Sequence, residues 1–205
     1  MINEFDVVIV GGGPAGLSAG LILGSAPAFV EEAKNRKIAI IDAGHSDALR
    51  AKFFNAAGLP YGIDGKDALN QVKEQLKNYD NVQFINGTVR KVNENKEFII
   101  DYFNSDTKTK EQVSSKVLVL ATGFRQWMIS GLDVPVVPFE RSENNTRVSI
   151  PNQDYKVKEN LYVCGLLAGV SSQWNITAGS GSQVGVHIIS NWAGSWKVVH
   201  DKVQE

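Results

Sequence analysis

Residues 5–17, Phe-Asp-Val-Val-Ile-Val-Gly-Gly-Gly-Pro-Ala-Gly-Leu, constrain the fold of this chain more than any other segment. The apolar run that begins them is rich in β-branched residues, which is typical of a strand buried on both faces. Three glycines follow, and then Pro14, which suits the first turn of a helix because its missing N–H costs nothing there. The spacing Gly11-x-Gly13-x-x-Gly16 matches a dinucleotide-binding turn, in which glycines allow a tight turn, a close pyrophosphate and helix–strand packing.

A second apolar strand strengthens this motif, which is a weak signal by itself. Residues 37–41 have a strand pattern and are followed by Asp42. In dinucleotide-binding folds, a carboxylate at this place binds the ribose hydroxyls of the adenosine. The alternative is a glycine-rich turn and an acidic strand end that occur together by chance.

Composition narrows the class of protein. A chain of 205 residues is long enough for one full core, and its net charge of −1 gives no reason to expect nucleic acid or an anionic membrane as a partner. The single cysteine excludes an internal disulfide framework and is compatible with a reducing cytosol, so we expect a cytoplasmic protein. Residues 7–30 lack charge, but six glycines and two prolines argue against a membrane span, and the acidic start argues against a signal peptide.

Hydrophobic periodicity predicts an α/β fold: a Rossmann-like central parallel sheet with helices, and a small antiparallel β-meander. The expected helices cover residues 14–23, 28–36, 67–77 and 173–199. The expected strands, besides the two above, cover residues 82–85, 88–92, 98–103, 112–115, 116–120, 146–150 and 161–165.

Four blocks together resemble the FAD-binding domain of low-molecular-weight thioredoxin reductase-like flavoproteins, in the pyridine nucleotide-disulfide oxidoreductase superfamily. The blocks stand in the order of that family: residues 8–16, residues 40–42, Leu-Val-Leu-Ala-Thr-Gly at 118–123, and residues 160–165 leading to Gln173-x-x-x-Thr-Ala-Gly-Ser-Gly181. The last two blocks are more specific than the glycine spacing alone.

The resemblance implies FAD in an extended pose. Gly11, Gly13, Pro14 and Ala15 would line the pyrophosphate, Asp42 would hold the ribose, and the backbone of Val89 would meet the adenine. Thr122 and Gly123 would close over the cofactor, while Gln173 and Ala178 would approach the isoalloxazine, where a helix N-terminus stabilises negative charge. The full set of implied FAD-binding residues is Gly11, Gly13, Pro14, Ala15, Gly16, Asp42, Ala43, Val89, Ala121, Thr122, Gly123, Gly165, Gln173, Trp174 and Ala178.

The chain departs from that family in three ways. Residues 124–157 are too few for the NADPH domain that the family inserts there, and they hold no strand followed by GxGxxG. We therefore expect a single FAD-binding domain over residues 1–205, built from 1–123 and 158–205. The redox Cys-x-x-Cys is absent, and Cys164 is interpreted as an inert core thiol rather than a flavin-contacting nucleophile. Leu166 stands where the family has an aspartate that meets the ribityl chain.

The remaining side chains include no evident pair of a general acid and a general base, so the catalytic residues stay unknown. His45, His187 and His200 are interpreted as loop, structural or solvated residues, and no cluster has metal-ligand spacing. Several aromatic residues could be either core residues or neighbours of the flavin: Phe53, Phe54, Tyr61, Trp127 and Trp174. Trp192 and Trp196, four apart on the expected last helix, suggest a packing or dimer surface.

Three functions are compatible with these residues. The first is a compact FAD-dependent oxidoreductase that takes reducing equivalents from a substrate, a redox partner protein or diffusible NAD(P)H. The second is a non-catalytic flavin-binding subunit of a larger redox complex. The third is a plain NAD-binding protein, which the Ala-Thr-Gly and Gln…Ala-Gly-x-Gly blocks disfavour. The family resemblance also suggests a homodimer.

Overall fold

The computed structural model describes residues 2–140 and 146–199. Its main sheet has β1 (Asn3–Val10) flanked in parallel by β2 (Ile38–Asp42) and β7 (Lys110–Leu120). Beyond them, β5 (Val82–Glu94) pairs in parallel with β2, and β11 (Leu161–Val163) pairs in parallel with β7. Two antiparallel strands complete the sheet: β10 (Lys156–Lys158) on the edge beside β11, and β6 (Phe98–Asn104) between β5 and β7. This arrangement confirms the expected α/β fold class.

The meander is continuous with the parallel sheet rather than a separate unit. The first part of β5 pairs with β2 as far as Asn86, and the rest, from Gly87, pairs with β6. The first part of β7 pairs with β6, and its last residues pair with β11. The strands expected at 82–85 and 88–92 are therefore one strand, as are those at 112–115 and 116–120. A register shift between Val89 and Lys91 bends β5, as a β-bulge does.

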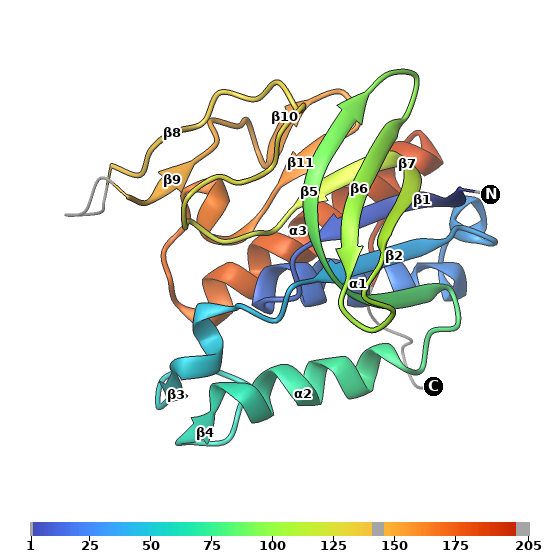
Figure 1. The fold of residues 1–205 in the computed structure, drawn as a ribbon. Coiled ribbons are helices and arrows are strands. Elements are labelled where there is room, and N and C mark those ends of the chain that lie inside the picture. The colour runs from blue at the N-terminus through green and yellow to red at the C-terminus, as the bar shows by residue number, and fades with distance from the viewer. Residues whose placement is uncertain (1, 141–145, 200–205) are drawn as a thin grey trace, which may run out of the picture.

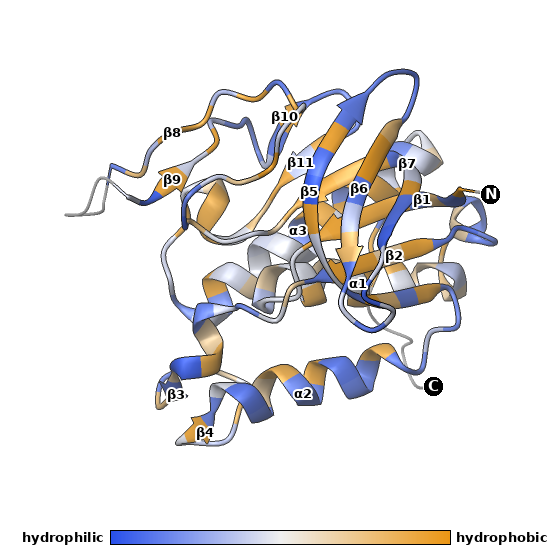
Figure 2. Cartoon of the chain, viewed as in Figure 1, coloured by the Kyte–Doolittle hydropathy of each residue, from blue (hydrophilic) through white to orange (hydrophobic). Residues whose placement is uncertain are grey.

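Each face of the sheet is covered by a different layer. Along β1 the side chains alternate: Val7 and Ile9 join the core under the helices, while Val8 and Val10 join the core under the meander. The helical layer contains α1 (Pro14–Ser25), α2 (Gly65–Leu76) and α3 (Trp174–Ala193). In Figure 1 the meander crosses in front of β1 and β2, with α1 and α3 behind them. Figure 2 shows apolar residues along β1 and β2 and a polar outer face on α2.

Two expected helices differ in the structure: one does not form, and the other ends earlier than expected. Residues 28–36 form no α-helix, and the chain after α1 makes two 3₁₀ turns, η1 (Ala26–Ala28) and η2 (Glu31–Ala33). The last helix stops at Ala193 instead of about Val199, because Gly194 adopts the left-handed conformation with φ of 64°. The remaining short elements are η3 (Asp47–Arg50), β3 (Lys52–Phe53), β4 (Ile63–Asp64), β8 (Val137–Pro138), β9 (Val148–Ser149) and η4 (Gly165–Ala168).

The connection between β7 and β10 packs against the meander. Its backbone joins β5 at Ser130, which donates to Arg90 O and accepts from Val92 N. Four of its apolar side chains are buried: Phe124, Ile129, Leu132 and Ile150. The last three belong to the core under the meander. The described residues of this connection contain only the short strands β8 and β9. Among the residues that the structure describes, no helix combines the length and hydropathy needed to cross a membrane.

Candidate dinucleotide-binding site

The glycine turn between β1 and α1 leaves no room for side chains. Gly11 has φ of +113°, and a Cβ there would lie 2.3 Å from the carbonyl oxygen of Ala121. A Cβ on Gly16 would lie 1.9 Å from the carbonyl oxygen of Gly11. The structure therefore brings Gly11, Gly16 and Ala121 together, and the first and third glycines of the motif are sterically required.

The start of α1 is suited to an anion. Gly13 is the N-cap residue in extended conformation, no side chain caps the helix, and Pro14 lies at its first position. The first turn contains no acidic residue. The positive end of the helix dipole and the N–H groups of the first turn thus lie at the glycine turn without a competing carboxylate of the helix. Gly123, at the end of the Ala-Thr-Gly block, has open space on its Cβ side. These features fit the phosphates of a dinucleotide.

Asp42 is held beside the glycine turn at the end of β2. Its Oδ1 accepts the backbone N–H of Gly12 at 3.1 Å and that of Gly44 at 3.2 Å. Its Oδ2 lies 3.5 Å from Nζ of Lys73 on α2, whose ammonium also lies over the ring of Phe84. With a side chain only 11% exposed, the carboxylate has a fixed orientation. The sequence pattern identified Asp42 but not Lys73, because an amphipathic helix does not reveal which of its polar residues meets a neighbour.

The last strand and α3 meet the start of α1. The backbone N–H of Gly165 donates to Ser180 Oγ at 2.8 Å, and that hydroxyl donates to Thr177 O at 2.6 Å. A Cβ on Gly165, where φ is +67°, would lie 3.0 Å from Cβ of Ala15. Gly165, Ala15 and the first half of α3 are therefore neighbours. The adjacent Leu166 is half-buried in η4.

The first residues of α3 differ in exposure. Gln173 is the exposed N-cap residue and Ala178 is half-buried. Trp174 is only 8% exposed and packs edge-to-face on Phe53 at 5.1 Å between ring centroids, so its side chain is part of the core. The amide of Asn175 exchanges two hydrogen bonds with the backbone of Ala57 and ties the loop after β3 to this end of α3.

Three other residues predicted to bind the cofactor, Ala43, Thr122 and Val89, lie outside the glycine turn. Ala43 directly follows Asp42 and is half-buried, and Thr122 is exposed after β7. Val89 is buried on β5, beyond Asn86, the residue that pairs with Asp42, and its partner is Tyr102 on the meander. A dinucleotide would have to extend along the sheet to meet both Gly13 and Val89.

Two loop residues that the sequence did not single out form an ion pair across this edge of the sheet. Asp47, in η3 after β2, pairs with Arg125 in the loop after β7. Arg50, in η3, binds the same carboxylate oxygen at 2.9 Å. No sequence pattern relates positions 47 and 125, since the pair depends on two loops that meet only in the fold.

Cys164 is confirmed as a core residue. Its side chain is fully buried at the end of β11, and this burial raises the pKa of its thiol to about 12. A thiol in this state is a poor nucleophile, because only the thiolate reacts.

The histidines do not form a catalytic group among the described residues. His45 is exposed in the loop after β2, and Nε2 of His187 faces Gln183 at 2.8 Å and Asp154 at 3.2 Å on the far half of α3. His200 lies outside the described residues. Within residues 2–140 and 146–199, no three His, Cys, Asp or Glu side chains are grouped to hold a metal.

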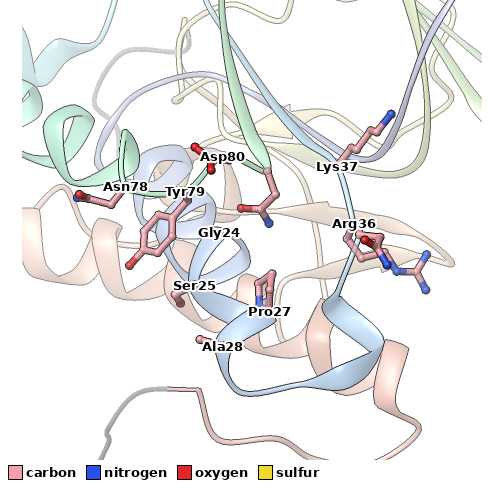
Figure 3. A pocket seen from close by; sticks show the side chains of 11 residues that line it. Gly24, Ser25, Pro27, Ala28, Arg36, Lys37, Asn78, Tyr79 and Asp80 are labelled. Atoms are coloured by element: carbon pink, nitrogen blue, oxygen red, sulfur yellow. The ribbon is translucent and has the colours of Figure 1, made fainter.

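Two cavities lie away from the glycine turn. One, of about 570 Å³, lies at the opposite end of α1 and β2 (Figure 3), where Tyr79 lies beside Gly24 and Ser25 and Lys37 extends away. The other, of about 710 Å³, lies between β10 and the second half of α3 and includes His187 and Trp196. Trp196 is beyond the end of α3, so it does not form the helical stripe with Trp192 that was expected; its ring contacts His187, while Trp192 packs under Arg36.

Comparisons with known proteins agree with this geometry. The sequence profile described as pyridine nucleotide-disulphide oxidoreductase matches residues 5–165. The chain belongs to this family. The match includes the glycine turn, Asp42 and the Ala-Thr-Gly block, and it confirms the superfamily that the sequence blocks suggested.

Curated relatives are similar to part of the chain. A ferredoxin–NADP reductase of Streptococcus pneumoniae is 29% identical over 130 residues, which are 60% of this chain and 36% of the relative. One of Oenococcus oeni is 29% identical over 143 residues, 66% of this chain and 38% of the relative. The chain thus spans little more than a third of the length of these relatives.

The solved structures show the fold. An oxidoreductase from Agrobacterium tumefaciens matches with a TM-score of 0.72 at 14% identity, covering 92% of this chain and 98% of the other. A thioredoxin reductase from Gloeobacter violaceus has the same TM-score at 12% identity, and all of both chains is covered. A ferredoxin-flavin thioredoxin reductase from Clostridium acetobutylicum reaches 0.67 at 13% identity, covering 95% of this chain and 100% of the other.

Proposed function

We propose that this chain binds FAD and acts as a compact flavin-dependent oxidoreductase. The observation that carries the proposal is the glycine turn, which sterically excludes side chains and holds the carboxylate of Asp42 through the N–H of Gly12. A backbone that comes this close to a ligand site, followed by an uncapped helix start, is suited to a pyrophosphate. The family of the chain supports a flavin as the redox group.

Each part of the site would have a separate task. The glycine turn and the start of α1 would bind the pyrophosphate, and Asp42 would accept hydrogen bonds from the adenosine ribose. Thr122 and Gly123 would close over the cofactor, and Gln173 and Ala178 would border the isoalloxazine. The first turn of α3 has no acidic residue, so its positive end remains available to stabilise negative charge. When bound, FAD would supply the hydride or electron transfer itself.

The organisation that we propose is a single FAD-binding domain, built from residues 1–123 and 158–205 and joined by the connection 124–157. The described part of this connection packs on the meander and has no strand–glycine–helix unit of its own. A separate donor would therefore reduce the flavin: diffusible NAD(P)H, a redox partner protein or the substrate. We also propose a cytoplasmic location, with which the single cysteine is compatible, and a homodimer, on the family resemblance alone.

The first experiment asks whether the purified protein retains FAD. We expect a two-banded flavin absorbance spectrum in the wild type. Gly13→Asp should lose the cofactor, since it places a charge at the pyrophosphate and a Cβ 3.2 Å from Ser46 Oγ. Gly58→Asp is the control, because Gly58 lies in an exposed loop with open space around it and Asp tolerates a positive φ. A colourless wild type that takes up no added FAD would contradict the proposal.

The second experiment separates an enzyme from a flavin-binding subunit. Under anaerobic conditions the bound flavin is mixed in turn with NADH, NADPH and a reduced ferredoxin. Bleaching by one of them supports the oxidoreductase and identifies the donor class. A stable flavin spectrum that none of the three bleaches would favour the non-catalytic subunit.

A further inference from the structure

The loops on either side of the glycine turn are joined by an ion pair. Strands β2 and β7 both pair with β1, so the loops that follow them border the glycine turn from opposite sides. Ligands of open α/β sheets bind outside the carboxyl ends of such strands. A contact between these two loops therefore crosses the mouth of the proposed dinucleotide site.

The loop after β2 is fixed at both its start and its end. Ser46 caps η3 by accepting the N–H of Ala48, and its Oγ lies 3.2 Å from the position that a Cβ on Gly13 would take. At the other end, the N–H of Gly65 donates to Ala51 O at 2.9 Å, and a Cβ on Gly65 would lie 1.8 Å from Ala48 O. The loop thus rests over the second glycine of the turn and is anchored on α2.

Asp47 is the carboxylate through which this loop reaches the other one. Its Oδ1 accepts Nη2 of Arg125 from the opposite loop and Nη2 of Arg50 from its own 3₁₀ turn. Partial burial opposes ionisation, but these two hydrogen bonds outweigh it and lower the pKa of Asp47. The carboxylate is therefore charged at neutral pH. The side chain of Arg125 is 58% exposed, so water competes for it and the pair can open and close.

We propose that the Asp47–Arg125 pair is a clasp across the mouth of the dinucleotide site and limits the rate at which the cofactor enters and leaves. This inference rests on the proposed FAD binding. Arg125 belongs to the short connection after β7, which stands where the resembled family has its NADPH domain. In this proposal the same connection also controls the access of FAD to its site. Because entry and exit would pass the same closed clasp, opening it would change the two rates together and leave the equilibrium nearly unchanged.

Three variants test the clasp in the full chain. Arg125→Gln and Asp47→Asn both open it, the first by removing the cation and the second by removing the anion. Arg50→Gln is the matched control, because Arg50 binds the same oxygen but does not leave its own turn. The release of FAD after dilution of the loaded protein is followed by flavin fluorescence, and association is followed by stopped flow.

We expect Arg125→Gln and Asp47→Asn each to speed the release of FAD by roughly twofold to fivefold, as loss of an exposed ion pair implies. Asp47→Asn should speed association by a similar factor, and the double variant should add nothing further. Raising the salt concentration should speed release from the wild type and not from Arg125→Gln. Arg50→Gln should match the wild type.

Other outcomes would overturn the clasp. If only Arg125→Gln speeds release, Arg125 binds the cofactor phosphate directly. If neither variant changes the rates, or if Arg50→Gln changes them as much, the pair has only a structural role. A wild type that binds no FAD would contradict the proposed function instead, and that result is visible before any variant is compared.

Discussion

Gly181 on α3 lies directly against Ala15 at the start of α1: a Cβ at position 181 would lie 1.9 Å from the carbonyl oxygen of Ala15. One turn further on, a Cβ at position 185 would lie 2.7 Å from the side chain of Ile22. The two glycines allow the backbones of α1 and α3 to approach each other closely. Because Ala15 follows the glycine turn, this contact also fixes the position of the proposed phosphate site.

Gly181→Ala should therefore weaken both the fold and the site. The added methyl group must push α3 away from the backbone of α1, and such overpacking costs about 1–3 kcal/mol. Urea unfolding should show this loss in the free energy of unfolding. The dissociation constant for FAD should rise as well, since the start of α1 moves with the contact.

Gly179→Ala on the same helix is the control. Position 179 is exposed, and nothing lies within 4 Å of a Cβ there. Alanine in place of a helical glycine should stabilise the protein by up to about 1 kcal/mol. Equal effects of the two substitutions would show that helix propensity, not the Ala15 contact, controls this part of α3.

The sequence predicted the elements that have a strong local signal and missed those that depend on distant parts of the chain. The apolar run before Gly11 and the Ala-Thr-Gly block were recognisable because each combines a buried strand with a required turn. The sequence pattern predicts two strands over residues 82–85 and 88–92, but β5 runs through Asn86-Gly87 without a break. A Cβ on Gly87 would lie 2.9 Å from the ring of Tyr102, so this glycine allows a close cross-strand contact rather than a turn.

The site residues likewise divide into those that have a local sequence signal and those that do not. Gly11, Gly16, Asp42 and Ala121 could be found because their positions relative to strand ends have a chemical meaning. Lys73 and the Asp47–Arg125 pair could not be found, because each contact joins segments whose separation along the chain has no pattern. The structure places all of these residues, but the cofactor-binding assignments of every one of them, and of Val89, Gln173 and Ala178, stay predictions.

Acid should weaken the meander through Glu111. Its carboxylate accepts a hydrogen bond from the hydroxyl of Tyr102 at 2.7 Å, across the β6–β7 pair. This bond, followed by those from Thr107 and Asn104, lowers the pKa of Glu111 from 4.5 to about 2. Because the pKa in the folded state is lowered, the stabilisation is fully present above pH 4.5 and is lost as the pH falls toward 2.

Glu111→Gln tests this prediction in urea unfolding at neutral and acid pH. The variant should be less stable than the wild type at neutral pH, and the difference should shrink as the pH falls through the range in which Glu111 titrates. Glu4→Gln is the control, because Glu4 is exposed and has no ion pair among the described residues. A difference that stays constant with pH would show that the Tyr102–Glu111 bond contributes nothing through ionisation.

Cys164 should resist thiol reagents in the folded protein. Full burial raises the pKa of its thiol to about 12, so both access and thiolate are lacking at neutral pH. A colorimetric disulfide reagent should detect no thiol in the native protein and one after unfolding in guanidinium. Reaction of the native protein at the rate of a free thiol would reopen the nucleophile interpretation.

Lys73 should affect FAD binding only through the orientation of Asp42. Asp42→Ala should remove a charged hydrogen-bond acceptor from the proposed ribose site, which costs about 1.5–3 kcal/mol and corresponds to roughly ten- to hundredfold weaker FAD binding. Lys73→Met should have a smaller effect, roughly twofold to fivefold, since the ammonium is partly exposed and acts only by orienting Oδ2 of Asp42.

The double variant distinguishes orientation from direct contact. If Lys73 acts through Asp42, Lys73→Met should not weaken FAD binding further once Asp42 is alanine. Lys66→Met is the control, because Lys66 is exposed on the same helix and has no ion pair among the described residues. Isothermal titration of each apoprotein with FAD gives the four dissociation constants of the cycle and that of the control. Additive losses would mean that Lys73 contacts the cofactor itself, because a residue that only orients a carboxylate has no effect after that carboxylate is removed.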